Sequence, residues 1–477
     1  MVYNEGSSLK KGRKMDKNKN LTEGKILPQI LTFSLPIIAT LLLQQLFNTA
    51  DTLVVGRWGG DTVEEREIAL SAVAACGALI NLLVGLFAGM ASGAGILASH
   101  AVGAKNYDRL KNIIHTSIIA ASISGIFIGA VGIIFARPLL TLMSTPTDVI
   151  DQSVLYMTAV FCGVPAQIIF NYCAAILRSS GNNTQPLVFL SISGALNVAL
   201  NIVMVVGFHT GALGVGVATA VANYAACIAI IIYMARTEGI CKFSFRKLRI
   251  DFATLKQIFS YGIPIGIQSS MFSIGNVVVQ SAFNSLNSTV FMSGSSICDN
   301  VAVYIVLVAN GIIQSTQIFV GQNMGAKRID RINSGVKHGL LLITLTTVVF
   351  GVIANLLAEP IFSLFAPNNT QVIEFAKTKL LIISPCYILG LIGDLIAACM
   401  GGMGETKTPM IVSVITICGV RIIWIYTVFA AFRNPYIIFA VYGVSWLINA
   451  TVQFIFYIRK RRSIEKKLLS SPKEVTV

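Results

Sequence analysis

The sequence predicts an all-α polytopic membrane protein, with twelve transmembrane helices in two six-helix lobes related by a parallel internal repeat. Three observations support this fold class. Of the 477 residues, 55% are hydrophobic and only 12% are charged, about half the roughly 25% charged fraction of soluble domains; the mean hydropathy is +0.74. The apolar residues form runs that reach the roughly 20 residues needed to cross a bilayer. Motifs of the first half also recur in the second half in the same order.

Motif content narrows the function classes. The pattern GxxxxGK[ST] does not occur, which argues against an ATP-driven motor on this chain. Nine cysteines without a CxxC pair and four scattered histidines predict neither a disulfide framework nor a metal site. We therefore expect no cofactor. The net charge is +15, but we expect no nucleic-acid partner.

The apolar runs can be taken in chain order. Residues 1–25 are polar and basic, and the run that follows is too long for a signal core, so it predicts a retained transmembrane helix. Pro36 and Pro264 lie inside predicted helices and are natural kink positions. The twelve predicted spans are 28–55, 68–97, 110–136, 151–177, 186–207, 211–235, 256–284, 291–318, 334–357, 374–399, 408–430 and 436–458.

Basic residues predict the orientation of these spans. Of the 36 Lys and Arg residues, 29 lie in the two tails and the even-numbered connections, and Arg421 lies within a span. The odd-numbered connections are assigned six: Arg57, Arg66, Arg137, Lys377, Lys379 and Arg433. The positive-inside rule then places both termini in the cytoplasm of a multi-pass cell-membrane protein.

An internal duplication relates the two halves. VGAKNYDR at 102–109 recurs as MGAKRIDR at 324–331, and GNNTQP at 181–186 recurs as GETKTP at 404–409. Because six spans separate the copies, the repeat is parallel, as in some transporters. The predicted organisation is a basic tail at 1–25, a lobe at 26–236, a cytoplasmic linker at 237–250, a second lobe at 251–460 and a tail at 461–477.

These motifs carry a family resemblance over nearly the whole chain. The first-helix stretch from Leu35-Pro36 to Gly56-Arg57, the VGAK and MGAK loops and the segment LRSSGNNT at 177–184 resemble the MATE (multidrug and toxic compound extrusion) transporters, NorM-like bacterial branch. The resemblance implies multidrug efflux by secondary antiport: a proton or Na⁺ enters as a drug-like, often cationic, organic compound leaves. The expected partners are small organic cations and membrane lipids, and the expected state is a monomer.

Asp51 is the strongest candidate for ion coupling, because an ionisable residue within a span is costly. Gln44, Asn48 and Asp51 are spaced i, i+4, i+7 and predict one polar stripe on a helix. A carboxylate away from water can hold a proton near neutral pH, or Na⁺ when ionised. The resemblance implies that the aligned first-helix Asp is the coupling residue.

The fifth span offers a partner surface for Asp51. Asn197 and Asn201 are spaced i, i+4, and Asn201 is predicted at a similar depth. Some members of the family have an Asp at this position, so the departure leaves the choice between proton and Na⁺ open. The alternative role of the amides is hydrogen bonding between helices.

The second lobe departs from the family pattern. NorM-like members often carry a Glu in the seventh helix, where this chain has only amides; Asp299 in the eighth span could substitute for it. Asp394 and Arg421 form a candidate ion pair, with a structural role as the alternative to coupling. The predicted substrate-binding residues are Gln44, Asn48, Asn276, Gln280 and Asp299.

Alternatives to an efflux antiporter remain. A lipid-linked oligosaccharide flippase of related two-lobe architecture would carry phosphates and favour several cationic groups in the cleft. One intramembrane Arg and three Asp favour cationic cargo instead. An intramembrane enzyme would need a catalytic constellation such as GxSxG, and a channel would need a pore motif; neither pattern occurs.

Overall fold

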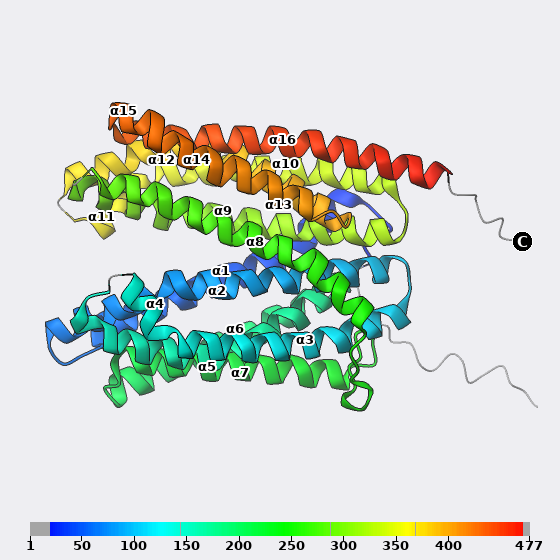
Figure 1. The fold of residues 1–477 in the computed structure, drawn as a ribbon, viewed down its shortest axis with the longest axis horizontal. Helices are drawn as coiled ribbons and strands as arrows, with labels where there is room; N and C mark the ends of the chain where they lie inside the picture. The colour runs from blue at the N-terminus through cyan, green and yellow to red at the C-terminus, as the bar shows by residue number, and fades with distance from the viewer. Residues whose placement is uncertain (1–19, 144, 287, 368, 471–477) are drawn as a thin grey trace, which may run out of the picture.

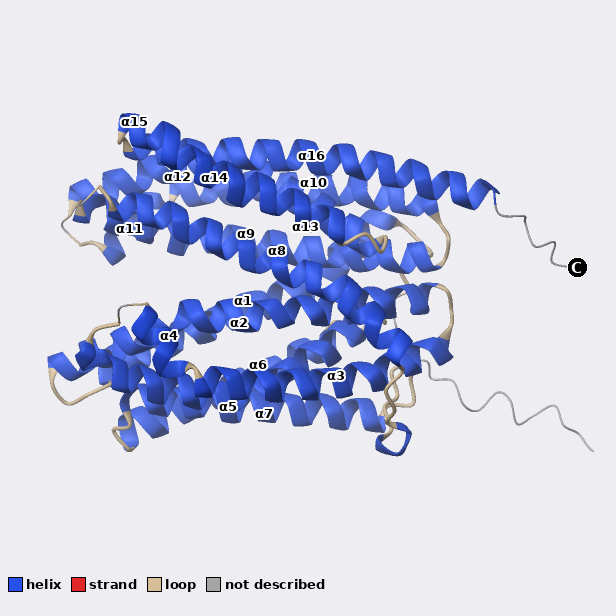
Figure 2. Ribbon diagram, viewed as in Figure 1, coloured by secondary structure: helices blue, strands red, loops and turns tan. Residues whose placement is uncertain are grey.

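The structure, a computed structural model, describes residues 20–470 except 144, 287 and 368. Within these residues it is helical, with no strand (Figure 2). The α-helices are α1 (Ile26–Trp58), α2 (Val63–Gly103), α3 (Tyr107–Ile134), α4 (Ala136–Leu142), α5 (Thr147–Ser179), α6 (Thr184–Asn201), α7 (Gly211–Arg236), α8 (Phe252–Asn284), α9 (Thr289–Gly325), α10 (Ile329–Leu356), α11 (Ala358–Phe365), α12 (Thr370–Gly402), α13 (Lys407–Ser413), α14 (Val420–Trp424), α15 (Ala430–Phe432) and α16 (Pro435–Ser470).

Twelve helices among the described residues are long and apolar enough to cross a membrane, which confirms the predicted number of spans. Two of these spans are not uniform α-helices. α6 continues as a π-helix through Ile202–Gly207, and the span from α13 to α15 contains π-helical segments at Val414–Gly419 and Ile425–Phe429. Several helices extend past the predicted bounds: α9 reaches Gly325 and α16 reaches Ser470.

The helices pack as two neighbouring bundles (Figure 1). The first bundle contains α1–α7, and the second contains α8–α16. We call the side on which α1 begins and α16 ends the terminal side; the other is the opposite side. The two bundles diverge toward the opposite side in this view. Residues 1–19 and 471–477, parts of the two predicted tails, lie outside the described residues.

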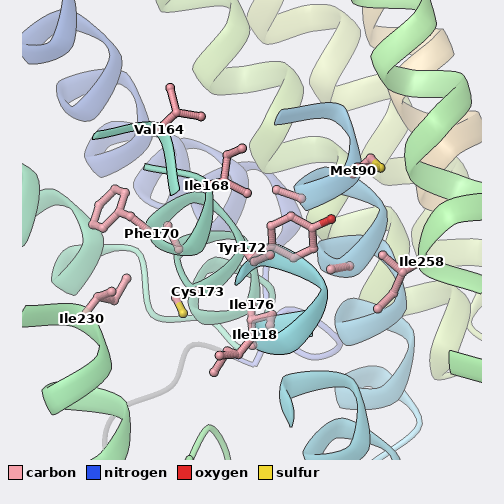
Figure 3. Close-up of a cluster of buried hydrophobic side chains, with 14 of the residues drawn as sticks. Met90, Ile118, Val164, Ile168, Phe170, Tyr172, Cys173, Ile176, Ile230 and Ile258 are labelled. Atoms are coloured by element: carbon pink, nitrogen blue, oxygen red, sulfur yellow. The ribbon is translucent and has the colours of Figure 1, made fainter. Parts of the chain in front are cut away.

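A large apolar core fills the first bundle (Figure 3). Tyr172, Ile168 and Ile176 of α5 are no more than 1% exposed, and they belong to one cluster with Met90 of α2 and Ile258 of α8. Because Ile258 lies on α8, the first helix of the second bundle, the cluster extends across the boundary between the bundles. This core anchors α2 and α5, which line the site described below.

Glycines allow the two bundles to approach closely at α2 and α8. Gly89 and Gly93 of α2 face Gly266 and Gly262 of α8; a Cβ at Gly93 would lie 2.6 Å from the backbone nitrogen of Gly262. Small residues spaced four apart let helix backbones pack against each other in a membrane. The backbones of α2 and α8 are therefore in contact in the halves of these two helices that lie nearer the terminal side.

Candidate functional site

Two matching hydrogen bonds join the bundles at the terminal side. Gln322 of α9 donates from Nε2 to the carbonyl oxygen of Ser179, 2.8 Å away, at the last residue of α5. His100 of α2 contacts the carbonyl oxygen of Gly402 through Nε2 at 2.7 Å, at the last residue of α12. Because a carbonyl only accepts, this contact requires the proton on Nε2. The internal repeat therefore places a side-chain donor from each bundle on a helix end of the other.

Glycines hold the ends of α2 and α9 together beside these bonds. A Cβ at Gly103 would overlap the carbonyl oxygen of Gln322, and a Cβ at Gly325 would overlap that of His100. The two glycines occupy matching positions in the VGAK and MGAK motifs. Their close approach closes the space between the bundles on the terminal side.

The segment before α1 reinforces this closure. Leu21 is 1% exposed, and its backbone N–H donates to Oε1 of Gln322 at 3.1 Å. Its carbonyl accepts from Nδ2 of Asn323 at 3.2 Å and from Arg331 at 3.1 Å. Leu21 and Thr22, assigned to a tail by the sequence, are thus buried against the second bundle.

A cavity of about 390 Å³ lies between the bundles, within the size range of small-molecule sites. Residues from α1, α2, α5 and α9 form its wall, including Gln44, which the sequence predicted as substrate-binding. Its polar lining residues are Gln44, Ser92, Ser99, Gln167, Asn171, Arg178, Ser179, Gln314 and Gln317. Arg178 is the only charged residue among the lining residues, and none of them is acidic.

Asp51 lies on α1, two helical turns from Gln44 toward the opposite side. Its Oδ1 accepts a hydrogen bond from Nδ2 of Asn201 at 2.5 Å. The Asn201 amide also contacts Oδ1 of Asn197, and Asn197 donates to the hydroxyl of Thr219 on α7, each at 3.3 Å. The structure therefore brings together the three residues predicted to couple an ion.

The oxygen atoms around Asp51 suit a small cation or a proton. Asn201 is fully buried, and its Oδ1 has no hydrogen-bond partner among the described atoms. Asp51 has no ion pair with any described Lys, Arg or His. A carboxylate beside an unpaired amide oxygen offers the oxygen donors that hard cations prefer. The part of the chain that the structure describes contains no cluster of three His, Cys, Asp or Glu side chains fit for a metal ion.

Asp299 has a cationic partner that the sequence analysis placed in a connection. Lys379 lies within α12, is 1% exposed and approaches Oδ1 of Asp299 to 2.7 Å through Nζ. The same ammonium donates to the hydroxyl of Ser295 at 2.7 Å and lies 5.5 Å from the ring centroid of Phe283. The assignment of Lys379 to an odd-numbered connection was therefore wrong. Asp299 itself remains about half exposed.

Arg421 is buried in a polar and aromatic pocket of the second bundle. Its NH1 donates to Oδ1 of Asn276 at 2.7 Å, and its guanidinium lies over the ring of Tyr442 at 4.8 Å. Among the described residues no ion pair within 4.0 Å joins Arg421 to Asp394, so the candidate pair is not formed in this structure. The guanidinium instead forms a hydrogen bond with the Asn276 amide and cation–π contacts with the aromatic rings.

The remaining predicted residues are more peripheral. Asn48 is exposed on α1, and Gln280 donates to Asn284 on its own helix at 3.2 Å. The position of Arg178 in the cavity wall was not predicted from the sequence, because this residue lies at the end of a predicted span, where basic residues serve topology. Gln167 and Asn171 lie one helical turn apart, earlier in the same helix, and also line the cavity. This pair of amides within an apolar span was the feature of the sequence that could have indicated a polar cavity.

Among the described residues, twelve helices long and apolar enough to cross a membrane form two repeated bundles with a polar cavity between them. This arrangement defines a secondary-transporter class. The MatE family model matches residues 36–203 and 264–427, so the chain belongs to this family of multidrug efflux transporters, which are not enzymes. The chain is 27% identical over 397 residues to the multidrug resistance protein YoeA of Bacillus subtilis (strain 168), covering 82% of this chain and 84% of YoeA.

Two further similarities extend over more of the chain. It is 21% identical over 445 residues to the multidrug export protein MepA of Staphylococcus saprophyticus, covering 92% of this chain and 95% of MepA. A solved outward-facing multidrug resistance MATE family transporter of the MOP superfamily has a TM-score of 0.87 at 17% identity, covering 95% of this chain and 100% of that one. The structural similarity confirms the predicted fold.

Proposed function

We propose that this protein is a cell-membrane antiporter that exports drug-like, cationic organic compounds in exchange for protons or Na⁺. The observation that carries the proposal is the Asp51 carboxylate on α1, hydrogen-bonded to Asn201 and lacking a cationic partner in the described structure. Such a group can take up an ion that no protein side chain already neutralises. The relatives named as multidrug resistance and export proteins support the same activity.

Transport would follow from two arrangements of the bundles. The hydrogen bonds of Gln322 and His100 hold the terminal side closed, and these bonds break when that side opens. Ion binding at Asp51 favours one arrangement and cargo favours the other. The two ligands are then exchanged because each binds one arrangement more tightly.

The positive-inside distribution orients this cycle. We place the terminal side in the cytoplasm, because the basic residues are concentrated in the tails and even-numbered connections. Asp51 then lies in the outer half of the membrane, seven residues beyond the cavity-lining Gln44. The protein would act as a monomer within the lipid, with membrane lipids as its surroundings.

Asp51→Asn tests the coupling role. In everted vesicles, the unaltered protein is expected to accumulate rhodamine 123, a cationic dye, when an ion gradient is imposed; Asp51→Asn should remove at least nine-tenths of that uptake. Asp61→Asn is a matched control, because Asp61 follows α1 and its side chain is 81% exposed. Full gradient-driven uptake by Asp51→Asn, with normal expression, would contradict the proposal.

Separate gradients identify the ion. Vesicles receive either a proton gradient or a Na⁺ gradient of the same size, and dye uptake is followed in each. A response to one gradient identifies the driving ion, and that response should disappear in Asp51→Asn. Equal uptake with neither gradient present would show that transport is not ion-coupled.

A further inference from the structure

The cavity between the bundles contains unused hydrogen-bonding capacity. The side chains of Gln44, Gln167, Asn171 and Gln317 line it and form no hydrogen bond with any described residue. Amide groups that face a cavity without protein partners must be satisfied by water or by a bound molecule. They come from three helices, so their free donors and acceptors converge from both bundles.

Arg178 adds an uncompensated positive charge to this cavity. Its side chain forms no ion pair with a described carboxylate, and its one side-chain hydrogen bond among the described residues runs from NH1 to Oε1 of Gln314 at 3.3 Å. None of the described residues that line the cavity is acidic. A guanidinium presents five N–H donors in a planar fork, so most of its donors remain free for a ligand in this position.

We infer that the cavity between the bundles contains a subsite for a carboxylate carried by the cargo, with Arg178 as the residue that recognises this group. This inference rests on the proposed export function and gives its cargo a second chemical feature, an anionic group. Arg178 pairs with the carboxylate through two parallel N–H donors, a geometry that guanidinium favours. The amides of Asn171 and Gln167 lie about two and three helical turns before Arg178 on α5, so they hydrogen-bond polar groups of the cargo beyond its carboxylate.

The position of the subsite fits a zwitterionic cargo. Asp51 lies two helical turns beyond Gln44 on α1 and is not among the residues that line the cavity, so its negative group and the positive Arg178 lie at different depths. A molecule with a cationic end and a carboxylate would match both charges. A purely cationic molecule would leave Arg178 unpaired in a cavity from which bulk water is partly removed, which is unfavourable.

Two dyes that differ only at the carboxyl group test the inference. Rhodamine 110 carries a free carboxylate, and rhodamine 123 is its methyl ester. Equilibrium binding of each dye to the purified full chain is measured by fluorescence polarisation, without any ion gradient. The unaltered protein is expected to bind the free acid more tightly than the ester, and Arg178→Gln should weaken the free acid about tenfold, as for a charge-assisted hydrogen bond. The ester should change less than about twofold.

Further variants separate recognition from structural damage. Arg57→Gln, an exposed arginine in the last turn of α1, is the matched control and should change neither affinity. Arg178→Lys keeps the charge without the planar fork, and it should weaken the free acid about threefold. If Arg178→Gln does not fold, the Arg178→Lys result decides the question.

Three results would overturn the inference. Equal losses of affinity for both dyes in an Arg178 variant would indicate a structural role. Stronger binding of the ester by the unaltered protein would exclude a carboxylate subsite. Binding of neither dye would exclude the cavity as a site for such cargo. The outcome is independent of the antiport proposal. Arg178-dependent binding of the free acid can hold when vesicles show no ion-driven uptake, and the reverse can also occur.

Discussion

The buried positive charge of Lys379 is stabilised by partners in its immediate surroundings. The Lys379 ammonium is 1% exposed and is surrounded by Asp299, two oxygens of Ser295 and the ring of Phe283. A buried ammonium without such partners is costly. The pair therefore stabilises the packing of α9 against α12, and it leaves Asp299 less available for cargo than an isolated carboxylate.

The Lys379–Asp299 pair predicts an asymmetric response to mutation. Asp299→Asn leaves the buried ammonium without its counter-ion and should lower the free energy of unfolding by about 3 kcal/mol. The double variant Asp299→Asn, Lys379→Met should recover most of this loss, because no unpaired charge remains. The measurement is thermal unfolding of the purified protein in detergent. A double variant no more stable than Asp299→Asn alone would refute this account.

Residue patterns predicted part of the candidate site. The spacing of Asn197 and Asn201 was enough to predict a polar face near Asp51, because i, i+4 residues share a helix face; the structure brings Asn201 to 2.5 Å from the carboxylate. Lys379 was missed because a charge near the end of an apolar run resembles a loop residue. Its partner lies 80 positions earlier in the chain, and single-sequence periodicity carries no information about that contact.

At the scale of helices, the closure between α2 and α9 depends on glycines without side chains. Gly103→Ala should force the end of α2 away from Gln322 and open the terminal side. Gly77→Ala on the same helix is the control, because a Cβ there meets nothing within 4 Å. A cysteine introduced at Ser99, which lines the cavity, should then be alkylated at least about threefold faster in Gly103→Ala. Peptide mass spectrometry distinguishes it from the native cysteines, and equal rates in both variants would contradict the prediction.

The turn between α12 and α13 is tied to α16 by an ion pair. Glu405 contacts Nζ of Lys460 at 2.7 Å. Burial alone would raise the pKa of Glu405, but hydrogen bonds from Lys460 and Thr408 outweigh it and lower that pKa below its ordinary value. A carboxyl with a lowered pKa in the folded state contributes stability above its unfolded pKa, and this contribution is lost as the pH falls through the folded value.

Lys460→Met therefore has a pH-dependent effect on stability. At pH 7 the variant should lose about 0.5–1 kcal/mol, as expected for a partly exposed pair. As the pH falls through the lowered pKa of Glu405, the carboxyl becomes protonated and the difference from the unaltered protein should shrink. Lys466→Met, exposed on the same helix, is the control in thermal melts over the same pH range. A loss independent of pH would show that the lysine stem, rather than its charge, is responsible.

Helix number was predictable because each span is a long apolar run, but the internal geometry of the spans was not. The run at 408–430 predicts one helix, whereas the structure divides it at two π-helical segments around Arg421. Apolar composition is the same for α- and π-helical turns, so hydropathy does not distinguish them. The tertiary contacts of Arg421 with Asn276 and Tyr442 lie between these segments.

For the whole molecule, the repeat produces the same contact twice. Gln322 reaches the end of α5, and His100 reaches the end of α12. A parallel repeat of six spans returns the chain to the side on which it began. Both described ends therefore lie on the terminal side, which Figure 1 shows for the end of α16.

This topology makes the orientation testable with fusions. If the basic connections face the cytoplasm, green fluorescent protein fused after Val477 should fluoresce in cells, and alkaline phosphatase at the same point should be inactive, because each reporter folds on one side of the membrane only. A phosphatase fused after Gly60, in the connection between α1 and α2, should instead be active. The reverse pattern would invert the cycle: Asp51 would lie in the cytoplasmic half, and the closure by Gln322 and His100 would face outward.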